Sequence, residues 1–124
     1  FIPVISTIGY DEHGNCYNIN ADTVAAQIAG DLKAEALISM TDIVGLLRDV
    51  NDDSSKIQKV FISDIPALIA DGIIKGGMIP KIDSMTQAIR NGCTKAFIID
   101  GRVPHSILME LLTDEGMGTM FKGR

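Results

Sequence analysis

Two short stretches of the sequence carry side chains that suit phosphoryl transfer. The first holds two amides and a carboxylate, at Asn18, Asn20 and Asp22, and the second places Lys81 shortly after the pair Gly76–Gly77. Phosphoryl transfer asks a protein mainly to position two anionic reactants and to neutralise the charge on the moving group. Amide donors and a lysine ammonium meet that need, so we expect the two stretches to face one crevice.

The first stretch allows two interpretations. Asn18 and Asn20 flank one residue, so in an extended backbone both amides point to the same side, and Asp22 follows in the first turn of the next helix. An amide offers both a donor and an acceptor, which suits an acyl group or a carboxylate in a substrate. The alternative is that Asn20 only caps the helix and Asp22 only interacts with the helix dipole. Spacing alone favours this alternative.

The second stretch is typical of a phosphate contact without being specific to one. Gly76 and Gly77 allow backbone N–H groups to approach a phosphate, and Lys81 adds a positive charge in the following helix. Paired glycines also occur in plain turns, and most lysines are solvated. Thr41 and Asp42, which follow an apolar run, either border a nucleotide or simply end a strand.

The sequence lacks the motifs of several other enzyme classes. The sequence contains no G-x-S-x-G, H-E-x-x-H or GxxxxGK[ST] pattern, and neither histidine has a spacing that suggests a triad or a metal site. His105, next to a proline, reads as a helix-start residue. Cys16 and Cys93 belong to no CxxC motif, so we expect both to be buried, reduced thiols, and we predict no protein metal site.

Length and composition indicate one soluble domain. The 124 residues are 46% hydrophobic and 22% charged, which is enough for a real core. The net charge of −5, with scattered basic residues, argues against a general nucleic-acid surface. No apolar run approaches the roughly 20 residues of a membrane span, and no secretory signal is visible, so we expect a cytoplasmic protein. Because the chain opens without Met on an apolar run, we expect a segment of a larger protein.

The periodicity of apolar residues predicts alternating strands and helices. Strands are expected at 2–8, 36–41, 95–100 and 118–121, helices at 21–32, 63–70, 81–91 and 104–112, and hairpins through 9–19 and 57–62. This alternation is typical of an α/β sheet wound by helices, with strand ends brought to one edge by right-handed crossovers. We expect residues 1–124 to form a single domain.

Five segments of the sequence indicate a protein family more specifically together than any one of them does alone. In chain order they are YNINADT at 17–23, TDIVGLL at 41–47, GGMIPK at 76–81, IDGR at 99–102 and DEGMGT at 114–119. From residue 2 to residue 121 they closely resemble the acetylglutamate kinases of the amino acid kinase family. The resemblance favours the functional interpretation of both stretches over the alternatives.

The resemblance implies a fold and an activity. The fold would be a three-layer αβα sandwich, a mainly parallel sheet with hairpin excursions, incomplete at its N-terminal side. The activity would be ATP-dependent phosphorylation of the side-chain carboxylate of N-acetyl-L-glutamate in arginine biosynthesis, with Mg2+ accompanying the nucleotide. A carboxylate acceptor is already ionised near neutral pH and needs no general base, which agrees with the absence of a poised histidine.

The resemblance also assigns roles to matching positions. Asp22 matches the acid that organises the catalytic lysines, and Lys81 matches the lysine that bridges the nucleotide and the transferring phosphoryl group. Asn18 and Asn20 match contacts to acetylglutamate. The residues that would border the nucleotide are Thr41, Asp42, Gly45, Gly76, Gly77 and Met78. The residues that match a feedback site for L-arginine, found in homo-oligomeric members, are His105, Glu115 and Gly118.

The chain departs from the family pattern in one respect. Another catalytic lysine, a glycine-rich loop and a substrate-binding arginine, all from the family's amino-terminal half, match nothing in this sequence. We therefore expect the carboxyl-terminal, nucleotide-side portion of a kinase, inactive alone. The alternatives are another amino acid kinase that acts on glutamate, aspartate or carbamate, and a non-catalytic half that binds nucleotide or arginine for regulation.

Overall fold

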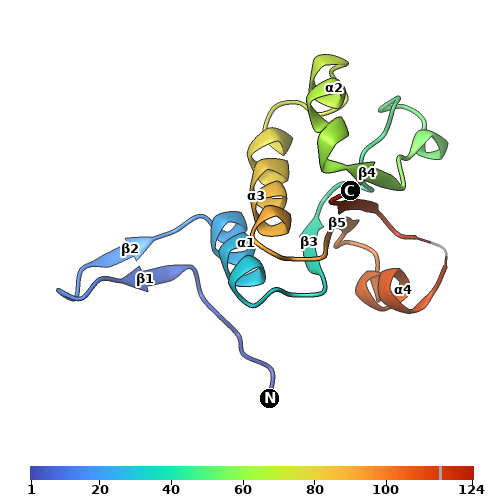
Figure 1. Cartoon of the computed structure of the whole chain (residues 1–124). Coiled ribbons are helices and arrows are strands. Elements are labelled where there is room, and N and C mark those ends of the chain that lie inside the picture. The colour runs from blue at the N-terminus through green and yellow to red at the C-terminus, as the bar shows by residue number, and fades with distance from the viewer. Residues whose placement is uncertain (115) are drawn as a thin grey trace.

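A four-stranded sheet forms the centre of the fold (Figure 1). The structure is a computed structural model that describes residues 1–114 and 116–124. The strands lie in the order β3 (Leu37–Thr41), β5 (Lys95–Asp100), β6 (Thr119–Lys122) and β4 (Lys59–Phe61). β3 pairs with β5 and β4 with β6 in parallel, whereas β5 and β6 are antiparallel.

Helices cover both faces of this sheet, as the sequence predicts. α1 (Ala21–Asp31) and α3 (Met78–Arg90) lie side by side on one face, and α4 (Ser106–Leu112) lies on the other (Figure 1). The short helix α2 (Ile65–Ala70) lies near β4. The expected αβα sandwich with a mainly parallel sheet is confirmed. Among the described residues, no helix is both long enough and apolar enough to cross a bilayer.

The strand β5 lies inside the sheet, and helices cover both faces of the sheet, so β5 is buried on both faces. Ala96 and Ile98 belong to the main core cluster, together with α3 residues such as Ile82. Phe97 and Ile99 alternate with them, so they point to the opposite face, where they are also buried. A continuous apolar run of this kind is what a strand covered on two sides requires.

α1 and α3 approach each other closely through small residues. Ala26, Ala29, Ala88 and Cys93 form a separate buried cluster between them. A Cβ atom added to Gly30 would lie 2.7 Å from the Cβ of the residue that follows α3, Asn91. The C-terminal ends of the two helices are therefore in contact, with no room for a larger residue.

The N-terminal hairpin stands away from this body (Figure 1). It pairs β1 (Ile8–Tyr10) with β2 (Cys16–Asn18) in antiparallel register. Its turn is organised by the Asp11 carboxylate, which accepts hydrogen bonds from the backbone and side-chain amides of Asn15, the backbone of His13 and the hydroxyl of Tyr17. These bonds, that of the Asn15 side chain first, lower the pKa of Asp11.

Two predictions about this region need correction, and a related one, about the second cysteine, is confirmed. The strand expected over 2–8 begins only at Ile8, because hydrophobicity alone does not supply a pairing partner, and Ile2 and Val4 are exposed. Cys16, on β2, is exposed rather than buried, because the hairpin has no layer packed on it. Cys93 is buried as expected.

Other elements also differ from the sequence prediction, and α2 and α4 each begin two residues after the predicted start. The segment at 57–62 is not a hairpin, since β4 pairs in parallel with β6 from the far end of the chain. Helix α3 begins at Met78, three residues before the predicted start at Lys81. Pro80 therefore lies in the first turn, where its missing N–H has no intrahelical partner to lose.

We expect Gly30→Ala to destabilise the protein by about 1 kcal/mol, the balance of a gain in helix propensity and a larger packing cost. Alanine favours a helix over glycine by roughly 1 kcal/mol, but overpacking against an anchored Cβ costs about 1–3 kcal/mol. Urea unfolding measures the change, and Asn91→Gly in the same background should recover most of the loss. A Gly30→Ala variant as stable as the wild type would show that the two helices are not tightly packed there.

Candidate active site

Asp22 and Lys81 form an ion pair between α1 and α3. The Lys81 Nζ lies 2.7 Å from Oδ1 and 2.9 Å from Oδ2 of Asp22, although the residues are 59 positions apart. The side chains are 25% and 35% exposed for Lys81 and Asp22 respectively, so the pair lies at the edge of the protein interior. The structure thus brings together the carboxylate of the first stretch and the ammonium of the second.

Both residues lie in the first turns of their helices, which run in the same direction. The contact of Asp22 with Lys81 joins the two helix starts, and that of Gly30 with Asn91 joins the two ends. Each helix start presents the positive end of the helix dipole, although backbone N–H groups there are already bonded, in α1 to Asn20 and in α3 to the carbonyl groups of Lys75 and Gly76. Two such ends beside one ammonium favour an anion at this place.

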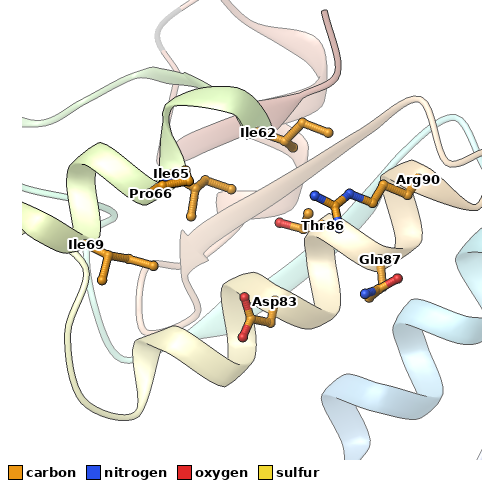
Figure 2. Close-up of a pocket in the computed structure, with 8 residues that line it drawn as sticks. All are labelled: Ile62, Ile65, Pro66, Ile69, Asp83, Thr86, Gln87 and Arg90. Carbon is orange, nitrogen blue, oxygen red and sulfur yellow. The ribbon is translucent and has the colours of Figure 1, made fainter.

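A hollow of about 200 Å3 opens beside the pair. Its walls come from the starts of α1 and α3 and from β3, and include Ala21, Asp22, Ala25, Leu37, Ser39 and Met85. A larger hollow of about 570 Å3 lies between α2 and another stripe of α3, where Asp83 and Arg90 face Ile65 and Ile69 (Figure 2). We place the candidate site at the smaller hollow, because Asp22 of the ion pair lines it.

The two asparagines of the first stretch have different surroundings in the structure. The Asn20 side-chain oxygen accepts hydrogen bonds from the backbone N–H groups of Asp22, at 2.9 Å, and Thr23, at 3.2 Å, so it caps α1. The capping role left open by the sequence is therefore present. Asn18 is exposed on β2, opposite Ile8 in the hairpin register.

The segment after β3 is fixed by hydrogen bonds from side-chain hydroxyls. The Thr41 hydroxyl contacts the N–H and carbonyl groups of Ile43 and the carbonyl oxygen of Ile99. Asp42 is exposed. Gly45 has a backbone φ of +124°, and a Cβ there would lie 2.8 Å from the Thr119 Oγ1. Only glycine fits this turn without strain.

Thr119 connects three segments that are distant in sequence. Its fully buried hydroxyl donates to the carbonyl oxygen of Ile57 at 2.7 Å and accepts from the N–H of Leu46 at 2.8 Å. The start of β6 thereby holds the loop after β3 against the segment before β4. This fixes the position of Gly45, one of the residues predicted to border a nucleotide.

The paired glycines lead directly into α3. Gly76 has a φ of +57°, and Gly77 precedes the first helical residue, Met78. Among the described residues, apart from the chain neighbours, no atom lies within 4 Å of where a Cβ would stand on either glycine. The open side of this turn is thus free of neighbouring atoms, and Met78 packs partly against the main core.

The turn after β5 is held by a buried carboxylate. Asp100, 5% exposed, accepts hydrogen bonds from the backbone N–H and the Nε of Arg102 at 2.9 Å, and from its Nη2 at 2.8 Å. The side-chain bonds of Arg102, the largest cause, lower the pKa of Asp100 to about 2. The same contact raises the pKa of Arg102, with a smaller contribution from the charge of Asp42.

The three residues matched to an arginine site are only partly described. His105 adopts the left-handed conformation, with a φ of +61°, directly before α4, so its expected place at a helix start is confirmed. Gly118 is buried against β5, where a Cβ would collide with the carbonyl oxygen of Ile98. Glu115 lies outside the described residues.

Comparison with known proteins identifies the family. A model of the amino acid kinase family matches residues 1–100. The chain belongs to the amino acid kinase family. It is similar to the acetylglutamate kinase of Brachyspira hyodysenteriae, with 58% identity over 121 residues that cover 98% of this chain and 42% of that protein. The acetylglutamate kinase of Methanosarcina barkeri is 57% identical over 120 residues, which cover 97% of this chain and 37% of that protein.

A solved structure supports the same fold. The protein smu.665 from Streptococcus mutans superimposes with a TM-score of 0.73 and 30% identity, over 98% of this chain and 43% of that one. The chain thus spans well under half the length of the relatives it matches.

The sequence-based prediction missed two residues that hold the turns at the ends of the strands. Thr119 and Arg102 both lie in segments that carry the resemblance, yet neither received a role. Arg102 has a local signal, because an acid, a glycine and an arginine directly after a buried strand are typical of a tight, charge-stabilised turn. Thr119 has none, since its partners are more than 60 residues away.

We expect Thr119→Val to destabilise the protein by about 2 kcal/mol or more, because valine leaves the buried groups of Leu46 and Ile57 without a partner. Urea unfolding checks this, with Thr119→Ser, which keeps the hydroxyl, as the matched control. Equal stability of the valine variant and the wild type would contradict the structural role of the hydroxyl.

Acid should remove the contribution of Arg102 to stability. The folded-state pKa of Asp100, about 2, is depressed from 3.8, so the stabilisation is present above 3.8 and is lost as the pH falls towards 2. The difference in unfolding free energy between the wild type and Arg102→Gln should therefore be constant above about pH 5 and shrink below pH 4. A difference that is independent of pH, measured by denaturant unfolding, would exclude this ion pair as its cause.

Proposed function

We propose that this chain is the carboxyl-terminal, nucleotide-side portion of a kinase that transfers the γ-phosphoryl group of ATP to the side-chain carboxylate of N-acetyl-L-glutamate. The two curated relatives at 58% and 57% identity are acetylglutamate kinases. Because the chain spans 42% and 37% of their lengths, the proposal concerns the complete gene product. An acyl phosphate and ADP would be the products.

The contact between Asp22 and Lys81 is the observation that carries this proposal. A partly exposed ion pair stabilises a protein by only about 0–1 kcal/mol, so stability is a weak reason for it. A fixed ammonium at two helix N-termini is worth more to a reaction that concentrates negative charge. We propose that Asp22 orients Lys81 and that Lys81 neutralises charge on the transferring phosphoryl group.

In this reaction the acceptor carboxylate oxygen attacks the γ-phosphorus and the bond to the β-phosphate oxygen breaks. No proton has to be removed from the acceptor, so no general base is required. The described residues include no cluster of three side chains able to hold a metal, so Mg2+ would arrive on the nucleotide phosphates, which is its usual mode in kinases. Protein groups then mainly position the reactants.

We propose that the nucleotide lies along the edge where the parallel strands end. The residues assigned to it are Thr41, Asp42, Gly45, Gly76, Gly77 and Met78. Since the hydroxyl of Thr41 is used by the backbone, its part would be to shape the wall. The open glycine turn before α3 supports a phosphate contact there.

The acetylglutamate would lie on the hairpin side of the same edge, near Asn18 and Asn20. The cap uses the side-chain oxygen of Asn20, which leaves its NH2 group as the donor for a substrate carboxylate. A hollow of about 200 Å3 is smaller than the roughly 300–1,000 Å3 of common ligand pockets. Residues of the complete protein would supply the remaining walls.

Feedback inhibition by L-arginine and a homo-oligomeric state complete the proposal. His105 and Gly118, at the start of α4 and the start of β6, are the described residues assigned to the arginine site. Addition of arginine to the kinase assay of the complete protein tests this assignment.

We expect Lys81→Ala to lower kcat of the complete enzyme by about 100-fold or more, as for the loss of one transition-state donor. A hydroxamate assay that compares acetylglutamate, glutamate and aspartate measures turnover and acceptor choice together. Lys122→Ala, which removes an exposed lysine of β6, is the control and should act like the wild type. Turnover of Lys81→Ala within a few-fold of the wild type would refute the role, and a preference for glutamate or aspartate would refute the substrate.

A further inference from the structure

Ser39 places a hydroxyl in the middle of the apolar strand β3. Leu37, Ser39 and Thr41 share one face of the strand, because side chains alternate along it. Leu37 packs against both core clusters, so this face meets α1 and α3. Ser39 therefore places a polar atom where the packing would accept an apolar side chain.

The hydroxyl of Ser39 lies next to the ammonium of Lys81. The Ser39 Oγ is 3.4 Å from the Lys81 Nζ, which also contacts both carboxylate oxygens of Asp22. Three elements, α1, α3 and β3, thus meet at one nitrogen atom. The distance exceeds the usual 2.7–3.2 Å of a hydrogen bond, but contacts at catalytic groups often tighten when substrate binds.

Asp22 alone leaves the direction of the ammonium poorly defined. Lysine ends a flexible four-carbon chain, and both of its contacts to Asp22 involve one carboxylate of the neighbouring helix. Ser39 belongs instead to the sheet, where it lies opposite the fully buried Ile98 of β5. A contact from a second, independent element fixes the position of a flexible group further, and groups on strands and helices are held more precisely than groups on loops.

We propose that Ser39 is a positioning residue for Lys81. Its hydroxyl oxygen accepts a hydrogen bond from Nζ and holds the ammonium beside the hollow, in the direction of the transferring phosphoryl group. The inference rests on the proposed kinase function, because it gives Ser39 a part in placing the charge that stabilises the transferred group.

Removal of this hydroxyl should affect turnover rather than binding. In the complete enzyme, we expect Ser39→Ala to lower kcat about three- to tenfold, with both KM values within about twofold of the wild type. Ser39→Thr keeps an oxygen at the same place and should restore kcat to within about twofold. The assay uses the acid that the wild type prefers among acetylglutamate, glutamate and aspartate. An error in the proposed substrate is therefore distinguished from an error in the role of Ser39.

Thr86 offers a matched control on the same helix as Lys81. Its hydroxyl donates to the carbonyl oxygen of Ile82 at 2.9 Å, within its own helix and away from the hollow, so Thr86→Val removes a hydroxyl without changing the ion pair. Thr86→Val should retain the wild-type kcat. Equal kcat for Ser39→Ala and the wild type, or equal losses in Ser39→Ala and Thr86→Val, would overturn the inference.

A second readout does not depend on turnover. The rate at which acetic anhydride acetylates Lys81, measured by mass spectrometry, should rise about twofold or more in Ser39→Ala, because the ammonium is held less firmly. It should stay at the wild-type value in Thr86→Val. An unchanged rate in Ser39→Ala would overturn the inference even if the protein phosphorylates none of the three acids.

Discussion

The contact between the Asp22 carboxylate and the Lys81 ammonium depends on how closely α1 and α3 pack. Small side chains between the helices, and the absence of a Cβ at Gly30, let the two helices pack closely in their C-terminal parts. The same packing points both helix starts at one place. A partly exposed ion pair cannot impose this arrangement, since it contributes only about 0–1 kcal/mol. The fold positions the charges, and the charges are then available for chemistry.

The edge of the sheet beside this pair is built from backbone held by buried polar groups. Thr119 fixes the loop that contains Gly45, and Asp100 fixes the turn that contains Arg102. Both side chains are buried and have their hydrogen bonds satisfied, which makes loops at this edge rigid. A rigid edge suits a reaction in which rate comes mainly from positioning and from electrostatic stabilisation.

Local patterns predicted much of this structure, and distant contacts account for the remainder. Apolar periodicity located α1 and β5 closely, because each is amphipathic or continuously buried along its own length. The prediction for 57–62 was wrong because the partner of β4, the strand β6, comes from the end of the chain. The chemistry of the two stretches and the family resemblance both led us to expect Asp22 and Lys81 at one crevice, but no local spacing predicts a contact between two separate helices. The contact of Ser39 with Lys81 has no sequence signal for the same reason.

A double-mutant cycle on kcat tests most directly whether Asp22 acts through Lys81. The complete enzyme would be measured as the wild type, Asp22→Asn, Lys81→Ala and the double variant. If the carboxylate serves to orient the ammonium, Asp22→Asn should reduce kcat strongly in the wild type but by less than about threefold in the Lys81→Ala background. Equal factors in both backgrounds would show that the two residues act independently and would contradict the orienting role of Asp22.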